Sequence, residues 1–305
     1  MHTTAAPTAT SASLVLGSGG ARGLAHIGVI QWMTENGYAI ESIAGSSMGA
    51  LVGGIYAAGK LDVYAEWVLA LERMQVLRLL DPTFSRRALF KGERIIDVLR
   101  DLIGDRDIEE LPMTYTAVAT DLDTGKEVWL RKGPLFDAIR ASIATPMVFT
   151  PSRYGSRTLV DGALVNPLPI APTLGDQTDL TVAVDLAGVV QTHPSTTTTP
   201  TSSAMEGGND YRQRIRTFIE TLGLARAPSK TAAAAQPAQG MFDIAFTAMQ
   251  VMQDTISRLK LAVYAPDVTI KIPLNACGYF EFWRAEEMIE LGRECAAKGF
   301  ADAGL

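Results

Sequence analysis

The 305-residue sequence predicts an α/β protein built on a parallel sheet. Two early units each run from a short apolar segment through a glycine-rich turn into a segment with helical spacing. The first unit has its apolar segment at 12–16 and its helical segment at 23–36, and the second has them at 40–44 and 48–58. Strands that alternate with helices in this way normally lie parallel, because each helix carries the chain back to the start of the next strand.

Further elements extend this pattern along the chain. Apolar runs predict strands at 114–120, 127–130, 158–161, 180–185 and, as an edge strand, 268–272. Helical spacing of apolar residues predicts helices at 63–80, 92–102, 135–143, 240–264 and 284–299.

Composition predicts the domain boundaries. Residues 1–12 are expected to form a flexible tail and residues 13–305 a single domain. Residues 189–240 differ from the rest, because polar low-complexity stretches there surround an amphipathic segment at 211–226. We expect this block to be an insertion or a flap over the site, and disorder without a function is the competing interpretation.

The composition also excludes several classes of protein. Hydrophobic residues make up 47% of the chain, enough for a large core, and the net charge of -6 gives no global attraction to nucleic acid. The two cysteines, Cys277 and Cys295, are expected to be reduced thiols in the cytoplasm. No run reaches the roughly 18 apolar residues of a membrane span, so any membrane contact is expected to be peripheral.

The most informative motif is G-x-S-x-G at 45–49, between a predicted strand and a predicted helix. This is the context of a nucleophile elbow, a turn so tight that the residues two before and two after the nucleophile must be small. Gly45 and Gly49 meet that requirement, and Ser47 is the candidate nucleophile. The following helix points its positive end towards the place where an oxyanion would form.

The earlier glycine-rich turn, at 17–23, admits several interpretations. A dinucleotide fingerprint counted from Gly17 requires a glycine where Arg22 stands, and no Walker motif is present. What remains is a loop whose N–H groups can face an anion, as an acyl hydrolase requires for its tetrahedral intermediate. An ordinary strand-to-helix turn is the competing interpretation.

A base for Ser47 is harder to find. A Ser–His–Asp triad requires a histidine, but His2 lies in the tail and His193 in the low-complexity block. His26 lies one turn into the first helix, out of the chain order of α/β-hydrolases, and we expect it to be structural. Asp161 follows a predicted strand and precedes a glycine, where burial would raise its pKa and strengthen it as a base. A turn residue that caps local N–H groups is an equally good interpretation of Asp161.

Several segments of the sequence are informative because of both their residues and their order along the chain. They are GSGGARGLAHIGV, GSSMG, ATDLDTG, ASIATPMVFTP and LVDGALVNPLP, followed near the C-terminus by PDVTIKIPL and FWRAEEMIELG. Together they resemble the patatin-like phospholipase family, especially its small bacterial members. The resemblance covers 13–188 and 241–300, and its motifs are specific as a set although each alone is not.

The resemblance implies a three-layer α/β/α sandwich around a central, mostly parallel sheet. It also implies a Ser–Asp dyad without a histidine base, in which Ser47 matches the nucleophile and Asp161 matches the aspartate of the D-G-[GA] motif, before Gly162. The family's oxyanion loop and its basic residue correspond to Gly19, Gly20 and Arg22.

Two positions depart from the family's commonest pattern. Ser18 stands where many members have glycine, and Ala163 replaces a third-position glycine. The change at Ser18 leaves a backbone donor in place, and alanine at position 163 is within the family's range, so we expect the activity to be retained.

The function that the resemblance implies is hydrolysis of carboxylic esters of lipids through an acyl-enzyme, with no metal and no cofactor. The substrate is expected to be a phospholipid, a lysophospholipid or another fatty acyl ester. Acyl transfer by the same dyad and non-catalytic lipid binding are the alternatives. The methionine-rich helix predicted at 240–264 is either a wall of an acyl pocket or an ordinary packing helix.

Overall fold

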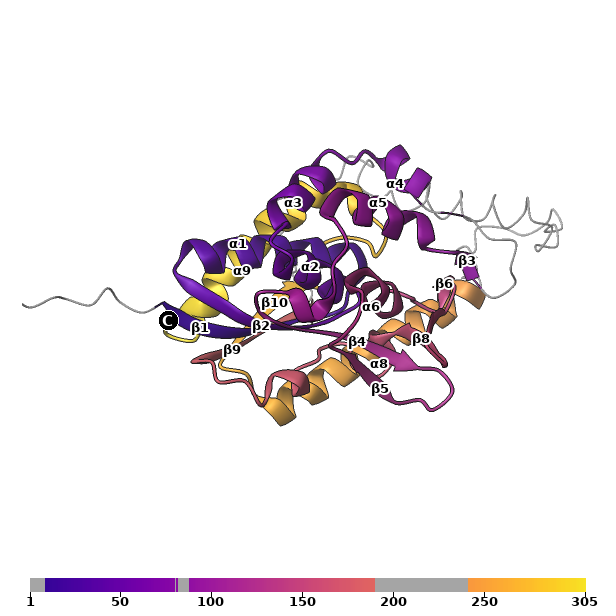
Figure 1. Ribbon diagram of the computed structural model, residues 1–305. Coiled ribbons are helices and arrows are strands. Elements are labelled where there is room, and N and C mark those ends of the chain that lie inside the picture. The colour runs from indigo at the N-terminus through magenta and orange to yellow at the C-terminus, as the bar shows by residue number, and fades with distance from the viewer. Residues whose placement is uncertain (1–8, 80, 82–87, 190–240) are drawn as a thin grey trace, which may run out of the picture. The chain divides into compact units, whose positions relative to one another are not determined.

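A computed structural model of the chain describes residues 9–79, 81, 88–189 and 241–305. The chain divides into two compact units, of which the first comprises Met1–Val190 and Ala248–Leu305 and the second Gln191–Thr247. The first unit contains the α/β core (Figure 1). The segment at 211–226 lies outside the described residues, so the insertion or flap predicted at 189–240 stays a prediction.

A central, mostly parallel sheet forms the middle of the first unit, in the order β10–β9–β1–β2–β4–β8–β7, with β5 also paired to β4. The strands are β1 (Thr10–Leu16), β2 (Tyr38–Ser46), β4 (Thr114–Asp121), β5 (Glu127–Leu130), β7 (Ser152–Tyr154), β8 (Arg157–Asp161), β9 (Leu180–Gly188) and β10 (Val268–Pro273). The strands from β10 to β4 are parallel, whereas β5, β8 and β7 are antiparallel to their neighbours. A separate parallel pair consists of β3 (Ala88–Phe90) and β6 (Met147–Phe149).

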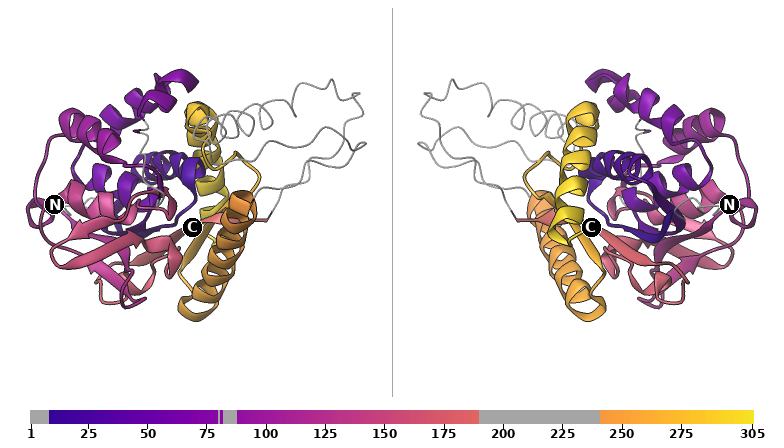
Figure 2. Two further views of the ribbon diagram at one scale, coloured as in Figure 1. Left: turned by 90° about the vertical axis from the view of Figure 1, so that its right-hand side faces the viewer. Right: turned by 90° about the vertical axis from the view of Figure 1, so that its left-hand side faces the viewer.

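Helices cover both faces of the sheet, so the unit is a three-layer α/β/α sandwich (Figures 1 and 2). One face carries α1 (Ala25–Glu35), α2 (Met48–Ala57), α3 (Leu61–Leu69), α5 (Glu93–Ile103), α6 (Leu135–Ser142) and α9 (Ala285–Asp302). The other face carries α8 (Met241–Tyr264), from Ala248 onward. Shorter elements are α4 (Arg73–Leu79) and the 3-10 turns η1 (Gly20–Leu24), η2 (Ile108–Glu110), η3 (Gly162–Leu164), η4 (Ala171–Thr173) and η5 (Phe282–Arg284).

Side chains that alternate along β1 build the two cores of the sandwich. Leu14 and Leu16 are fully buried in the core under α1 and α2. Val15, between them, belongs to a second core with Leu261 and Tyr264 of α8. Because successive side chains of a strand point to opposite faces, a continuous apolar run is what a sheet covered on both faces requires. The predicted fold class is confirmed.

Most predicted elements match the structure within a few residues, and β10 is an edge strand as predicted. The single helix predicted at 63–80 is wrong, because the chain forms α3 and α4 there. The Gln75 side chain accepts the Glu72 N–H at 2.9 Å, the bond that an N3 residue makes in a capping box, and so marks the start of a new helix. Neither glycine nor proline marks this break in the sequence.

The first strand begins earlier than the predicted end of the tail. Thr10 already pairs with Tyr38 of β2, so residues 10–12 belong to the sheet. Cys277 and Cys295 are both free thiols. Within the described ranges, no helix has both the length and the apolar character that a membrane span requires.

Candidate active site

Two strands bring the predicted nucleophile and base to the same edge of β4. Ala117 pairs with β2 on one edge of β4 and with β5 on the other. Ala119 also pairs with β5, so its second partner, Asp161 of β8, lies on the edge that β2 occupies. Ser46, the last residue of β2, is opposite Val118, one residue before Ala119. The ends of β2 and β8 therefore meet, and the residue after Ser46 comes beside Asp161.

Ser47 lies in the tight turn between β2 and α2, with φ 55° and ψ -122°. A positive φ is rare for a residue with a side chain and carries a strain that the surrounding structure must offset. A Cβ on Gly45 would lie 2.4 Å from the Gly49 carbonyl carbon, and one on Gly49 would lie 2.0 Å from Leu16 O. Only glycines fit at these two positions, as the motif predicted. The turn places Ser47 at the positive end of α2.

The side chains of Ser47 and Asp161 are hydrogen-bonded to each other. Ser47 Oγ donates to Asp161 Oδ2 at 2.8 Å, and the two residues are only 3% and 1% exposed. Thr145 Oγ1 donates to the same oxygen at 2.7 Å, and the Ala163 N–H donates to Asp161 Oδ1 at 2.9 Å. Three donors therefore fix the orientation of the carboxylate.

Burial raises the pKa of Asp161, although the hydrogen bonds from Ala163, Thr145 and Ser47 partly lower it again. Desolvation disfavours the charged form of a carboxyl group, whereas donors favour it. The net rise makes the carboxylate a stronger base towards the proton of a nearby hydroxyl. The backbone at this point is also tightly fitted, because a Cβ on Gly162 would lie 2.1 Å from a carbonyl oxygen of β4.

The end of α6 holds the nucleophile from a second direction. Ser142 Oγ accepts the Ser47 N–H at 3.0 Å and donates to Val118 O at 2.6 Å. Thr145, the donor to Asp161, follows shortly after α6 ends. One short segment therefore orients both the backbone of Ser47 and the carboxylate of Asp161.

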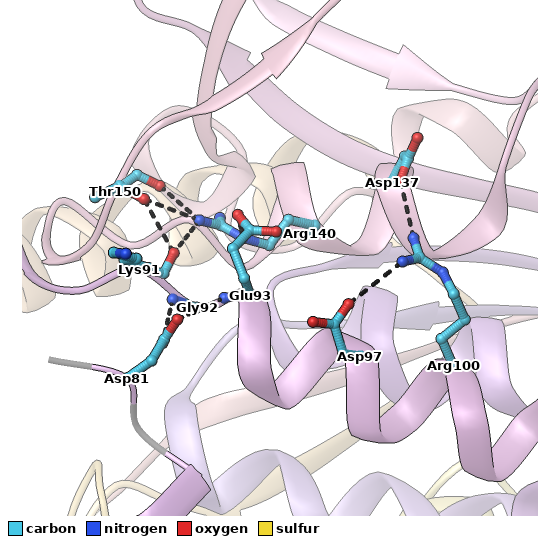
Figure 3. A network of polar contacts seen from close by, with 9 residues as sticks. All are labelled: Asp81, Lys91, Gly92, Glu93, Asp97, Arg100, Asp137, Arg140 and Thr150. Carbon is cyan, nitrogen blue, oxygen red and sulfur yellow. Dashed lines mark hydrogen bonds and ion pairs between the residues drawn. The ribbon is translucent and has the colours of Figure 1, made fainter. Parts of the chain in front are cut away.

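A network around Arg140 anchors α6 (Figure 3). The Arg140 Nε donates to Glu93 Oε1 at 3.2 Å, and Nη2 donates to the carbonyl and the hydroxyl of Thr150, both at 3.1 Å. The same nitrogen also donates to the Lys91 carbonyl oxygen. Burial lowers the pKa of Arg140, which is 4% exposed. These bonds join α6 to the start of α5 and to the chain after β6, and they restrain the helix that orients Ser47.

The predicted oxyanion loop lies between β1 and α1. The Gly17 N–H donates to a carbonyl of β9 at 3.0 Å, and the Ala21 N–H donates to Tyr279 O at 2.8 Å. Between them, the N–H groups of Gly19 and Gly20 have no hydrogen-bond acceptor among the described residues. Unpaired backbone donors of this kind are available to an anion.

Arg22 of this loop binds carbonyl groups with its side chain. Nε donates to Leu186 O at 3.2 Å and Nη1 donates to Leu274 O at 3.4 Å. Arg22 is 6% exposed, and burial lowers the pKa of its guanidinium. Because Leu186 lies in β9 and Leu274 follows β10, the side chain ties the loop to the ends of two neighbouring strands.

His26 supports the same loop. It is fully buried, and its Nε2 bonds to Gly17 O at 2.8 Å, so this nitrogen carries the proton and donates. Burial lowers the pKa of His26 to about 4, which keeps the imidazole neutral. Its hydrogen bond goes to the backbone of the loop and not to Ser47 or Asp161. The two other histidines, His2 and His193, lie outside the described residues.

Sequence reasoning missed three side chains at this site. Ser142 and Thr145 lie in ASIATPMVFTP, a segment that resembles the family, but no spacing rule singles them out. Tyr279 comes from the segment after β10, and its hydroxyl lies 3.5 Å from Thr145 Oγ1. No sequence signal connects Tyr279 with the dyad. The described residues include no group of three or more His, Cys, Asp or Glu that could hold a metal ion.

Comparison with known proteins identifies the family. A sequence model of the patatin-like phospholipase family matches residues 14–174, which include both Ser47 and Asp161. An uncharacterized NTE family protein of Mycobacterium tuberculosis is 40% identical, over 94% of this chain and 90% of its own length. The chain belongs to the patatin-like phospholipase family.

Two longer relatives carry names that mention an activity. A patatin-like phospholipase domain-containing protein of Caenorhabditis elegans is 33% identical over 61% of this chain and 14% of its own. Neuropathy target esterase sws of Drosophila virilis is 32% identical over 53% of this chain and 11% of its own. Membership of this family supports a lipid esterase or phospholipase activity in general terms.

The buried His26 predicts a pH dependence of stability. Its pKa falls from 6.5 to about 4 on folding, so the unfolded chain binds the proton more readily. Stability from this group is therefore present above pH 6.5 and is lost as the pH falls towards 4, by about 3 kcal/mol in total. Denaturant unfolding of wild type and His26→Gln across this pH range measures the effect.

Glutamine keeps an N–H donor for Gly17 O but does not titrate. The loss of stability that wild type shows between pH 6.5 and 4 should therefore be absent in His26→Gln. Asp161 also titrates, and because its pKa is raised, its contribution to stability grows as the pH falls, opposite to that of His26. Both proteins contain Asp161, so the difference between their pH profiles of stability reports His26 alone. Identical pH profiles of stability would contradict the assignment of a neutral, buried His26.

Proposed function

We propose that the protein is a serine acyl hydrolase that cleaves carboxylic ester bonds of lipids, with Ser47 as nucleophile and Asp161 as its base. The observation that carries the proposal is the 2.8 Å hydrogen bond from Ser47 Oγ to Asp161 Oδ2 at a strained turn. Membership of the patatin-like phospholipase family and the names of two relatives support it.

In the first half of the reaction, Asp161 Oδ2 accepts the Ser47 proton while Ser47 Oγ attacks the ester carbonyl carbon. Negative charge then develops on the carbonyl oxygen. The N–H groups of Gly19 and Gly20, and that of Met48 at the start of α2, are the donors we assign to this oxyanion. As the intermediate collapses, the proton passes from Asp161 to the leaving alcohol, and the acyl group stays on Ser47.

In the second half, a water molecule replaces the alcohol. Asp161 takes a proton from the water, and the resulting hydroxide attacks the acyl carbon. The fatty acid leaves when the bond to Ser47 Oγ breaks, and Asp161 returns its proton to Ser47. Every proton that Asp161 accepts is released within the same cycle.

A carboxylate is a weak base for a serine hydroxyl, and the site offsets this weakness by burial. An exposed aspartate has a pKa of about 3.9, far below that of a hydroxyl. Burial raises the pKa of Asp161, and hydrogen bonds hold its Oδ2 in contact with Ser47 Oγ. The base is therefore both stronger and already positioned.

The substrate we propose is a fatty acyl ester such as a phospholipid or lysophospholipid, reached by peripheral contact with lipid. Acyl transfer would use the same dyad, and product analysis with added alcohols or lysolipids separates transfer from hydrolysis. Non-catalytic lipid binding accounts less well for the site, because a strained Ser47 and a buried Asp161 reduce stability without aiding binding.

Substitution of the dyad tests the proposal directly. Ser47→Ala and Asp161→Asn should each lower kcat for p-nitrophenyl esters by roughly 10⁴-fold or more, because each removes a group that acts in the transition state. The measurement is steady-state hydrolysis over a series of acyl chain lengths, with folding checked by circular dichroism.

Ser46→Ala is the matched control for the nucleophile. Ser46 is the neighbouring buried serine, and its Oγ has no hydrogen-bond partner among the described residues. Its loss should leave turnover near the wild-type level. An active Ser47→Ala variant would overturn the assignment of the nucleophile, and an active Asp161→Asn variant would overturn that of the base.

The pH dependence of hydrolysis follows from the protonation of Asp161. Asp161 acts only when deprotonated, so the rate should rise with pH through a pKa above the ordinary ~3.9. Thr145→Val removes a donor that stabilises the carboxylate, so this rising limb should move to higher pH, by roughly one unit.

Thr173→Val provides the control for Thr145→Val. Thr173 is also buried, but its hydroxyl donates to Ile170 O, in a different part of the core. Its pH profile should coincide with that of wild type. A Thr145→Val profile that coincides as well would mean that Thr145 does not stabilise the charged form of the base.

A further inference from the structure

Tyr279 reaches the dyad from a distant part of the chain. It lies between β10 and η5, and its carbonyl oxygen accepts the Ala21 N–H at 2.8 Å. Its ring lies against Gly20, where φ is +58° and a Cβ would come within 2.7 Å of the ring carbon Cγ. Two features of the oxyanion loop, an N–H donor and a glycine, therefore accommodate this one tyrosine.

The segment that carries Tyr279 is held at both ends. Before it, Arg22 Nη1 donates to Leu274 O at 3.4 Å. After it, Glu281 Oε2 accepts the Gly278 N–H at 2.8 Å and a donor of Arg284 at 2.9 Å. These contacts explain how a residue in a connecting segment keeps a defined position at the site.

The hydroxyl of Tyr279 faces the hydroxyls of the site. It lies 3.5 Å from Thr145 Oγ1, and although burial raises the pKa of Tyr279, hydrogen bonding to the Thr145 and Ser47 side chains partly lowers it again. Thr145 and Ser47 both direct their own hydroxyl protons to Asp161 Oδ2, at 2.7 and 2.8 Å. Because the Thr145 and Ser47 protons are both directed to Asp161, Tyr279 is the hydroxyl that donates in its contact with Thr145.

Tyr279 is suited to donate that proton in a hydrogen bond and not to act as a base. Burial of its hydroxyl, together with the charge of Asp161, raises the pKa of Tyr279 to about 12, so the phenol is neutral at ordinary pH. The residue as a whole is only partly buried.

We propose that Tyr279 is a third catalytic side chain, whose hydroxyl donates a hydrogen bond to Ser47 Oγ while that oxygen carries developing negative charge. The charge develops when the O–H bond of Ser47 breaks and its proton moves to Asp161. It develops again when the bond between Ser47 Oγ and the acyl carbon breaks in deacylation. Tyr279 keeps its proton in both steps. This inference rests on the proposed hydrolase function.

The physical need for such a donor comes from the weak base. A carboxylate accepts the serine proton less favourably than an imidazole would, so the base alone gives less help to the charge that develops on the serine oxygen. A preorganised donor in a site that excludes water stabilises such charge, and removal of one comparable donor costs about 10²–10³ in kcat.

Tyr279→Phe tests the proposal, because phenylalanine keeps the ring that lies on Gly20 and the backbone bond to Ala21. We expect kcat to fall by about 10²-fold with little change in KM, since the donor acts on transition-state charge. The control is Tyr115→Phe, which removes another buried tyrosine hydroxyl, one that donates to Ala50 O at 2.7 Å. That variant should lose thermal stability but keep its turnover.

A ring-fluorinated tyrosine at position 279 provides a second readout, which a purely structural role would not affect. Fluorination acidifies the phenol but preserves its shape. The activity should then fall at alkaline pH as the phenol ionises, in a range where wild type, with its pKa of about 12, is still active. This variant also keeps the proposal testable if Tyr279→Phe does not fold.

The outcomes separate this inference from the function on which it rests. If wild type hydrolyses no ester, the proposed function itself fails. If wild type is active and Ser47→Ala is not, but Tyr279→Phe matches wild type, only the role of Tyr279 is overturned. An alkaline limb that does not move on fluorination would overturn it equally.

Discussion

The site depends on one constraint, which is that β2 and β8 share an edge of β4. Ser46 pairs with Val118 and Asp161 with the next residue, so the two strands end against each other. The 2.8 Å bond between Ser47 Oγ and Asp161 Oδ2 follows from that register. A shift of one residue in either strand would turn its side chains to the other face of the sheet and separate the pair.

The electrostatics of the site show how a chain can bury a carboxylate and still use it. Burial raises the pKa of Asp161, and the donors Ala163, Thr145 and Ser47 limit that rise. The hydrogen-bond donors keep Asp161 sufficiently deprotonated to act as a base, while burial raises its pKa and therefore its basicity. Thr145 belongs to the segment after α6, which the Arg140 network anchors, so the protonation of the base is linked to packing some distance away.

The local features of the site could be predicted from the sequence because they depend on neighbours in the chain. The turn at Ser47 needs glycines two residues away, and Asp161 ends an apolar strand before a glycine, so short motifs identify both. Tyr279 could not be predicted, since its place depends on how the chain after β10 packs against Gly20. The break between α3 and α4 was missed for a similar reason, because a side-chain cap marks it and not a glycine or proline.

The central claim is that Ser47 is a nucleophile activated by Asp161, and covalent labelling tests it most directly. Wild type and Asp161→Asn would each be treated with a fluorophosphonate, and the adduct would be located by mass spectrometry of the peptides. The account predicts one adduct per wild-type chain, on Ser47, and a much slower reaction of the variant. An adduct on another residue, or equal labelling rates in the two proteins, would contradict it.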